Sequence, residues 1–186
     1  DIVPSIENPS NYMTTNVQGT VNVLEAARYS KVKKFIYAAS SSCYGINNHR
    51  TKENTKINPQ HPYALSKYLG EEAALHWNIV YGLPVNSIRI FNAYGPRVRT
   101  TGVYGAVFGV FFKQKLKNKP LTVIGNGKQS RDFVYVTDVA KAFFKAATSN
   151  KVGQIYNLGS DNPQSINKLV KLIGGKTTFI PNRPGE

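Results

Sequence analysis

The sequence has 186 residues, of which 41% are hydrophobic and 18% charged, a composition typical of a globular domain and not of a disordered chain. Its formal net charge is +14, but the Lys and Arg residues are spread along the chain. This pattern favours a solvated surface or an anionic small substrate over nucleic-acid binding. The single Cys43 excludes an internal disulfide and a Cys-rich metal site, so we expect no metal and a reducing compartment, the cytoplasm. We also expect no membrane span, because the most apolar run, residues 102–112, is too short for one.

The first half of the chain alternates predicted helices and strands. Residues 11–29 carry apolar or small side chains at three- and four-residue spacing, which predicts an amphipathic helix. Residues 33–39 are a short apolar run typical of a buried parallel strand. After a polar loop, Pro62 begins a predicted helix over residues 62–81, and residues 84–91 are the next strand candidate. This order implies a parallel sheet with right-handed crossovers.

Beyond Arg97 the pattern is less regular. We predict, in order, a helix over 104–117, a strand at 121–124, a turn at 125–127, a helix over 138–148, a strand at 154–158, a helix over 165–173 and a strand at 176–180. The segment 95–102, which contains proline and glycine, is the predicted domain boundary. We therefore expect a sheet domain, residues 1–97, and a smaller lobe, residues 98–186, of which residues 133–149 could pack back on the sheet.

Tyr63 and Lys67 are the first candidate site. They are one helical turn apart and share a face, and a fixed cation beside a phenol favours the phenolate, a usable base. Such a pair also occurs on many ordinary amphipathic helices. Ser40 and Asn92, however, follow the two predicted strands on either side of this helix. Ligands bind beyond the carboxyl ends of such strands, so we expect the four side chains to converge.

Seven motifs carry a resemblance along the whole chain. They are Asn16-Val-Gln-Gly-Thr20, Ser40-Ser-Ser-Cys-Tyr-Gly45, Pro62-Tyr-Ala-Leu-Ser-Lys67, Arg89-Ile-Phe-Asn-Ala-Tyr-Gly-Pro96, Leu121-Thr-Val-Ile-Gly-Asn-Gly127, Arg131-Asp-Phe-Val-Tyr-Val136 and Arg183-Pro-Gly-Glu186. Together they resemble the extended short-chain dehydrogenase/reductase family, specifically nucleotide-sugar epimerases and dehydratases of the UDP-glucose 4-epimerase type. The resemblance implies an α/β fold: a partial Rossmann-type parallel sheet, with its first strands missing, and a smaller α+β substrate-binding lobe.

The resemblance also implies roles for individual residues. Tyr63 would be the catalytic acid/base, Lys67 would favour its ionised form and hold the nicotinamide ribose of NAD, and Ser40 would bond the reacting sugar oxygen. The implied cofactor-binding residues are Asn16, Ser40, Tyr63, Lys67 and Phe91. The implied residues for a nucleotide-diphosphate sugar are Asn92, Val107, Thr122, Val123, Arg131, Arg183 and Glu186, with both arginines on the diphosphate.

Two of these assignments have alternatives. Arg131 could instead form an ion pair with Asp132 or Asp138. Glu186, the last residue of the sequence, could be a frayed end.

The implied activity is that of an NAD-dependent nucleotide-sugar epimerase. Tyr63 would take the hydroxyl proton while hydride leaves the sugar carbon, through a transient 4-keto sugar. A 4,6-dehydratase of this family uses an Asp-Glu pair directly after the Ser/Thr, where this chain has Ser41 and Ser42, which favours an epimerase. A dehydratase, decarboxylase or reductase on the same scaffold, and a non-catalytic nucleotide- or RNA-binding protein, are the alternatives.

The chain departs from the family at its amino-terminal side. It contains neither the family's first strand nor its Gly-x-x-Gly-x-x-Gly turn, and Gly102-Val-Tyr-Gly-Ala-Val-Phe-Gly109 follows no predicted strand. We therefore expect a product truncated at the amino terminus that binds NAD poorly as it stands. Ala106 replaces an Asn that relatives often have near the nucleotide. Because relatives commonly pair through two helices, the resemblance also predicts a homodimer through residues 11–29 and 62–81.

Overall fold

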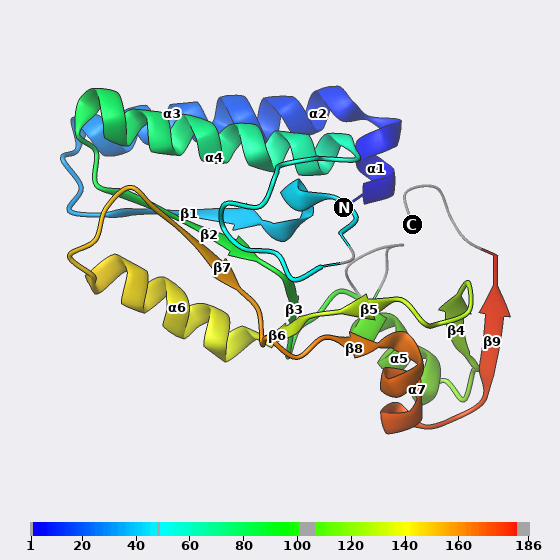
Figure 1. Ribbon diagram of the computed structural model, residues 1–186. Helices are drawn as coiled ribbons and strands as arrows, with labels where there is room; N and C mark the ends of the chain where they lie inside the picture. Colours follow the sequence, from blue (N-terminus) through cyan, green and yellow to red (C-terminus); the bar gives the residue numbers. More distant parts are fainter. Residues whose placement is uncertain (1, 48, 101–106, 182–186) are drawn as a thin grey trace.

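A computed structural model describes residues 2–47, 49–100 and 107–181 of the chain (Figure 1). Its main sheet has three parallel strands in the order β1-β2-β7, where β1 is Phe35–Ser40, β2 is Val85–Ile90 and β7 is Gln154–Leu158. The register places Ser40 level with Ile90, and Ile90 level with Leu158. The predicted parallel sheet is confirmed. The carboxyl ends of its three strands lie level with one another, and the candidate site begins at these ends.

Helices cover both faces of this sheet (Figure 1). On one face α3, Gly19–Tyr29, lies beside α4, Pro62–Tyr81, while α6, Val136–Thr148, lies on the opposite face. The side chains that close the α3/α4 face are Leu24, Ala27, Tyr37, Ala39, Ala74, Leu83 and Val85. This apolar core fixes α4, which carries Tyr63 and Lys67, against β1.

The bounds of α4 follow from its end residues. Pro62 occupies the first turn, where its missing N–H costs no hydrogen bond. The ring of His61 caps the helix, because its Nδ1 accepts a hydrogen bond from the backbone N–H of Ala64 at 3.2 Å. Gly82 ends the helix in the left-handed conformation, with φ of 67°, which glycine adopts without a Cβ clash. The helix predicted over residues 62–81 is confirmed.

The helix predicted over residues 11–29 is interrupted in the structure. The segment begins with α1, Ile2–Glu7, and α2, Pro9–Met13, and passes through a π-helical turn, Thr14–Gln18, before α3. The Thr20 hydroxyl, in the first turn of α3, donates back to the carbonyl of Asn16 in the π-helical turn at 2.6 Å. Apolar spacing cannot show such a one-residue widening, and turns of this kind are frequent at functional sites.

A second group of elements packs around its own core. It contains α5, Val107–Leu116, α7, Ile166–Ile173, and the parallel pair β4, Leu121–Ile124, and β9, Thr177–Ile180. The buried core residues are Phe111, Leu121, Val123, Ile166 and Leu169. The part of the predicted helix 104–117 that precedes residue 107 lies outside the described residues.

Short strands connect the two groups. β3, Asn92–Tyr94, pairs with β6, Phe133–Tyr135, and β5, Ser130–Arg131, pairs with β8, Gln164–Ser165. Both α6 and β7 lie with the first sheet although they follow residue 98 in sequence. The domain boundary at residue 97 therefore stays a prediction. The part of the chain that packs on the first sheet extends beyond residues 133–149, because it includes β7.

Two further findings concern membrane-spanning helices and metal sites among the described residues. Across residues 2–47, 49–100 and 107–181, no helix is long and apolar enough to cross a membrane. In the same ranges, no group of three or more His, Cys, Asp or Glu side chains could hold a metal ion.

Candidate active site

Ser40 stands where β1 ends. It caps the short helix η2, Ser41–Tyr44, because its Oγ accepts the backbone N–H of Ser42 at 3.3 Å. Its hydroxyl also shares a 2.8 Å hydrogen bond with the hydroxyl of Ser42. The second serine after β1 therefore positions Ser40 and brings no carboxylate to this edge of the sheet.

Lys67 reaches β1 from α4. Its Nζ lies 4.6 Å from the ring centroid of Tyr37 in β1, while the Tyr37 hydroxyl donates to the carbonyl of Lys67 at 3.2 Å. Burial lowers the pKa of Lys67 from its ordinary value, and the charge of Glu71 acts in the opposite direction. Within the described part of the chain the Lys67 ammonium has neither a hydrogen bond nor an ion pair. It is a half-buried cation with its donors free for a ligand.

Tyr63 lies one turn before Lys67 on α4. Its ring is stacked 6.0 Å from that of His61 and meets Tyr12 edge-on at 6.2 Å. Among the described residues its hydroxyl has no hydrogen-bond partner, and no hydrogen bond joins it to Ser40. The structure therefore places Ser40, Tyr63 and Lys67 on facing elements, with the phenol and the ammonium both open to a third group.

The two remaining predicted cofactor residues flank the same edge. The Asn16 amide, in the π-helical turn, donates to the hydroxyl of Ser66 at 2.9 Å, and Ser66 lies between Tyr63 and Lys67 on α4. Phe91 directly follows β2, and its N–H donates to the carbonyl of Leu158 at 3.0 Å. Asn16 thus braces α4, and Phe91 is held at the carboxyl end of the sheet.

The predicted substrate residues are distributed over the second group of elements and the short strands that connect the two groups. Asn92 opens β3, where its amide donates to the carbonyl of Asp132 at 3.1 Å. Val107 begins α5 and packs against the second core. Thr122 is half-buried and accepts a 2.7 Å hydrogen bond from Gln114, whereas Val123 is 1% exposed, with its side chain in the core. The side chain of Val123 therefore faces the protein interior.

Arg131 makes neither of the ion pairs that its sequence neighbours suggested. The Asp132 carboxylate accepts from the backbone N–H groups of Ser160 and Asp161, at 2.8 and 3.0 Å, and Asp138 pairs with Lys141 at 3.2 Å. The exposed Arg131 guanidinium donates only to the adjacent Ser130 carbonyl within the described ranges, at 3.0 Å. It is free to bind an anion. Arg183, Glu186 and Ala106 lie outside the described residues.

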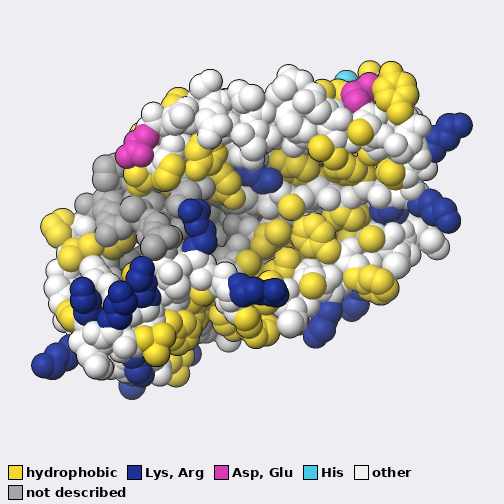
Figure 2. Space-filling view, turned by 180° about the vertical axis from the view of Figure 1, so that it is seen from behind, with side chains coloured by type: hydrophobic (Ala, Val, Ile, Leu, Met, Phe, Trp, Pro, Cys, Tyr) yellow, Lys and Arg dark blue, Asp and Glu magenta, His cyan; other side chains and the backbone are white. Residues whose placement is uncertain are grey.

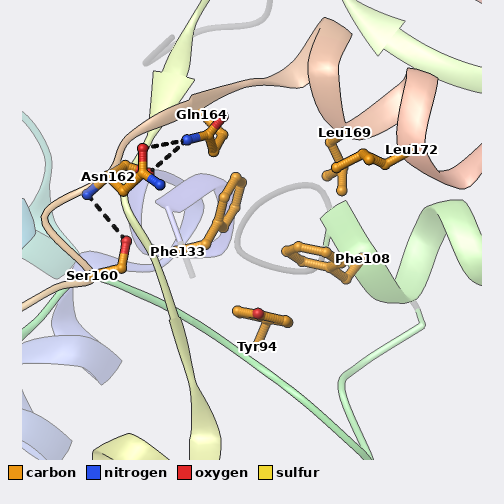
Figure 3. A pocket seen from close by; sticks show the side chains of 8 residues that line it. All are labelled: Tyr94, Phe108, Phe133, Ser160, Asn162, Gln164, Leu169 and Leu172. Atoms are coloured by element: carbon orange, nitrogen blue, oxygen red, sulfur yellow. Dashed lines mark hydrogen bonds between the residues drawn. The ribbon is translucent and has the colours of Figure 1, made fainter.

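A cavity of about 380 Å³ opens beside these residues (Figure 3). Tyr94 and Phe108 stack at 4.4 Å and 14°, and Phe133 meets Phe108 edge-on at 5.0 Å. The rest of the lining is Ser160, Asn162, Gln164, Leu169 and Leu172. Figure 3 shows the aromatic rings facing the polar loop residues across the cavity. Three predicted substrate residues adjoin this lining: Asn92 pairs with Phe133, Arg131 pairs with Gln164, and Val107 precedes Phe108. The aromatic side of the cavity was not predicted from the sequence.

A buried network behind Lys67 was also missed. Glu71, one turn after Lys67, binds Arg89 of β2 at 2.5 Å, and the two side chains are 1% and 3% exposed. Arg89 donates in turn to the Tyr44 hydroxyl at 2.7 Å, and Tyr44 to Asn157 at 2.7 Å. The available signal was an arginine inside an otherwise apolar strand, because a buried charge requires a partner.

Comparisons with known proteins identify the family and the fold. Residues 2–159 match the model of the NAD dependent epimerase/dehydratase family. A Methanocaldococcus jannaschii protein, provisionally named a UDP-glucose 4-epimerase, is 41% identical over 188 residues, which cover 98% of this chain and 61% of that protein.

Two solved structures share the fold. The UDP-N-acetylglucosamine 4-epimerase of Methanobrevibacter ruminantium, in complex with UDP-N-acetylmuramic acid, superposes with a TM-score of 0.96 at 30% identity, over 100% of this chain and 62% of that chain. The UDP-glucose 4-epimerase of Thermus thermophilus, in complex with NAD, gives 0.91 at 30% identity, over 100% and 63%. The chain thus spans about three fifths of the length of these relatives. Since the family model covers most of the 186 residues, the chain belongs to the NAD dependent epimerase/dehydratase family.

Proposed function

We propose that this protein is an NAD-dependent nucleotide-sugar epimerase of the UDP-glucose 4-epimerase type, which inverts a sugar carbon through a transient 4-keto sugar. The observation that carries the proposal is the face of α4 on which the Tyr63 hydroxyl and the Lys67 ammonium have no polar partner among the described residues. The helix α4 packs against β1, the strand that ends at Ser40, and ligands bind beyond the carboxyl ends of such strands.

The chemistry of this donor set fits part of NAD. A ribose diol offers two oxygens, which suit an ammonium and a phenol on adjacent turns of one helix. Asn16 and Phe91 border the same edge. The sequence contains no Gly-x-x-Gly-x-x-Gly pattern for the pyrophosphate, so we assign it only the nicotinamide side of the site. Calorimetry of this chain with NAD should accordingly show no micromolar binding.

Each residue of the site then has one task. NAD, when bound, provides the acceptor for hydride from the sugar carbon. Tyr63 takes the proton of the sugar hydroxyl and later returns it, Lys67 stabilises the phenolate, and Ser40 holds the reacting oxygen by its hydroxyl. Ser41 and Ser42 place no acid beside Ser40, so the site has no group there for the elimination of water by a 4,6-dehydratase.

The nucleotide part of the substrate belongs to the second group of elements. The Arg131 guanidinium, which has no ion pair among the residues that the structure describes, suits a diphosphate, and the stacked rings of Tyr94 and Phe108 offer a flat apolar surface to a planar base. Asn92 of β3, Val107 of α5 and Thr122 of β4 are the further substrate contacts in this proposal. In this proposal Arg183 is a second contact to the diphosphate, and Glu186 binds a ribose hydroxyl.

The proposed enzyme is a cytoplasmic homodimer. α3 and α4 lie side by side and expose apolar side chains, among them Val23, Leu69 and Ile79. Two such helices per subunit form a four-helix interface when the subunits meet about a two-fold axis. The lone buried Cys43 suits a reducing compartment.

A conversion assay tests the proposed activity. The chain would be joined to the segments of the Methanocaldococcus jannaschii relative that it does not cover, and NAD and UDP-glucose supplied. We expect UDP-galactose to form. The proposal fails if this protein binds NAD yet converts no UDP-sugar, and salt-sensitive binding of single-stranded RNA would then support the nucleic-acid-binding alternative.

A further inference from the structure

Glu71 and Arg89 form a buried ion pair directly behind the Tyr63/Lys67 face. Arg89 donates from Nε to both carboxylate oxygens of Glu71, at 2.9 and 3.1 Å, and from Nη2 at 2.5 Å. The Ser87 hydroxyl donates to the same carboxylate at 2.6 Å. Both oxygens of Glu71 are therefore occupied from the β2 side.

The other side of Arg89 is equally well held. Its Nη1 donates to the Tyr44 hydroxyl at 2.7 Å and to the carbonyl of Glu53 at 3.1 Å. Burial alone would lower the pKa of Arg89, but the hydrogen bonds that Arg89 donates to Glu71 and Tyr44 outweigh it and raise that pKa. The guanidinium is thus a permanent cation, fixed to the helix that follows Ser40, to the loop before α4 and to α4 itself.

Glu71 is also positioned to reach Lys67. The two residues are four apart on α4, a spacing at which a carboxylate and an ammonium on one helix pair. Both adjoin Tyr37, because Lys67 stands over its ring and the charge of Glu71 acts on its hydroxyl. Yet Lys67 makes no ion pair in the described part of the structure. The carboxylate beside it is already held by Arg89.

We propose that Arg89 is a positioning residue which, by occupying both oxygens of Glu71, keeps the Lys67 ammonium out of an intrahelical ion pair and directed toward Tyr63 and its ligand. This inference rests on the proposed function for its consequence, since Lys67 serves the reaction only when its donors are free. The geometry itself does not depend on that function.

Removing Arg89 should redirect Lys67. Without the guanidinium, Glu71 is a buried carboxylate whose nearest cation on α4 is Lys67, and such a charge does not stay unpaired. The other titratable groups around Lys67 are Tyr63 on α4 and Tyr37 on β1, with Tyr44 and Cys43 of η2 on the far side of the Arg89 pair. None of these is cationic, so none can replace Arg89 at Glu71.

The test is an NMR titration of Lys67 in this chain, without cofactor or substrate. Isotope-labelled lysine reports the ammonium directly, and Lys67→Arg assigns its signal. In Arg89→Met we expect the Lys67 midpoint to rise by about one pH unit or more, the usual effect of a carboxylate brought within contact. Glu71→Gln in the Arg89→Met background removes the carboxylate and should return the midpoint to or below that of the unmodified chain.

Two further variants keep the test decisive. Arg28→Met breaks a matched Arg–Glu pair on α3, between Arg28 and Glu25, and should leave the Lys67 midpoint unchanged. If Arg89→Met does not fold, Arg89→Lys retains a cation without the two-pronged guanidinium, frees one oxygen of Glu71 and should give a smaller rise. An unchanged Lys67 midpoint in folded Arg89→Met, or in Arg89→Lys, overturns the proposal.

The readout separates this proposal from the proposed function. A shift of Lys67 confirms the role of Arg89 even if no UDP-sugar is ever converted. Conversely, an active epimerase whose Lys67 titrates identically with and without Arg89 retains the proposed function and loses this inference.

Discussion

Cys43 lies in η2, three residues after Ser40, and is 1% exposed. Burial raises the pKa of its thiol to about 11, so the neutral form is favoured in the folded state. Because only the thiolate attacks electrophiles, we expect alkylation by iodoacetamide at about pH 8 to be slow in the native protein and fast in urea. Mass spectrometry of the alkylated chain measures both rates. Rapid alkylation of the folded chain would show that η2 does not pack as described.

At the scale of single residues, the sequence indicated which side chains belong to the candidate site better than it indicated the contacts that they make. The Tyr63 and Lys67 pair was readable from spacing, and the structure places both on α4, where Lys67 reaches Tyr37 of β1. The freedom of Arg131 was not readable, because it depends on a distant loop, residues 159–161, that occupies Asp132. Contacts between segments far apart in sequence leave no local pattern.

At the scale of elements, the cap of α4 makes the helix that carries Tyr63 sensitive to acid. Only a neutral His61 ring can accept the N–H of Ala64, and burial lowers the pKa of His61 from its usual value. This stabilisation is complete above the unfolded pKa of about 6.5 and is lost as the pH falls through the lowered folded pKa. We predict that His61→Ala destabilises the protein by about 1 kcal/mol at neutral pH.

Urea unfolding at two pH values checks this prediction. His61→Asn retains an N-cap acceptor that does not titrate, so it should keep most of the stability and lose the dependence on pH. Equal stability of the Ala and Asn variants at neutral pH would show that the imidazole does not cap the helix.

Gly70 permits the close packing of α4 on β1 and on the π-helical turn. A Cβ there would lie 2.8 Å from the carbonyl oxygen of Asn16 and 2.9 Å from Cζ of Tyr37. We expect Gly70→Ala to lower the free energy of unfolding by about 1–3 kcal/mol, the range for an overpacked core. Glu72→Ala, on the exposed side of the same helix, is the matched control and should change it by about 0.5 kcal/mol or less. Chemical denaturation measures both, and a neutral Gly70→Ala would contradict the packing.

Among the elements, those with a strong local signal were predicted well. The helix 62–81 has Pro62 and Gly82 at its ends, and the strands 121–124 and 154–158 match their observed bounds. The short pairs β3–β6 and β5–β8 were not resolved from sequence, since strands of two or three residues show no periodicity. The π-helical turn at Thr14–Gln18 was missed because apolar spacing does not reveal a one-residue widening of a helical turn.

At the scale of the whole molecule, the predicted dimer interface lies on the surface of α3 and α4. Ile79 is 79% exposed on α4, and Leu69 lies on the same helix toward the site. Replacing both by Glu introduces like charges across a two-fold interface, so light scattering should find a monomer where the unmodified chain is a dimer. Phe144→Ser on α6, on the opposite face of the sheet, is the control and should leave the mass unchanged. A dimer that survives the paired substitution would place the interface elsewhere.

Two further features of the whole molecule are the edge of its main sheet and the distribution of charge on its surface. β1 is the edge of the β1-β2-β7 sheet and pairs only with β2 among the described residues. On the face shown in Figure 2, Lys and Arg side chains are frequent at the end that carries α5 and α7 and also occur at the opposite end, while the visible acidic groups lie along the upper edge of the view. The net charge of +14 can be read from the sequence, but the distribution of the basic side chains over the surface cannot.

The central claim is that Tyr63 performs the proton transfer of a UDP-sugar epimerase. The most direct measurement compares UDP-glucose conversion by the completed protein, the chain joined to the uncovered segments of its Methanocaldococcus jannaschii relative, with that of Tyr63→Phe and Tyr12→Phe. Tyr12 contacts the Tyr63 ring edge-on and serves as the control. We expect Tyr63→Phe to bind NAD and UDP-glucose normally and to lose about 100-fold or more in kcat, while Tyr12→Phe stays active. Full activity of Tyr63→Phe would contradict the account.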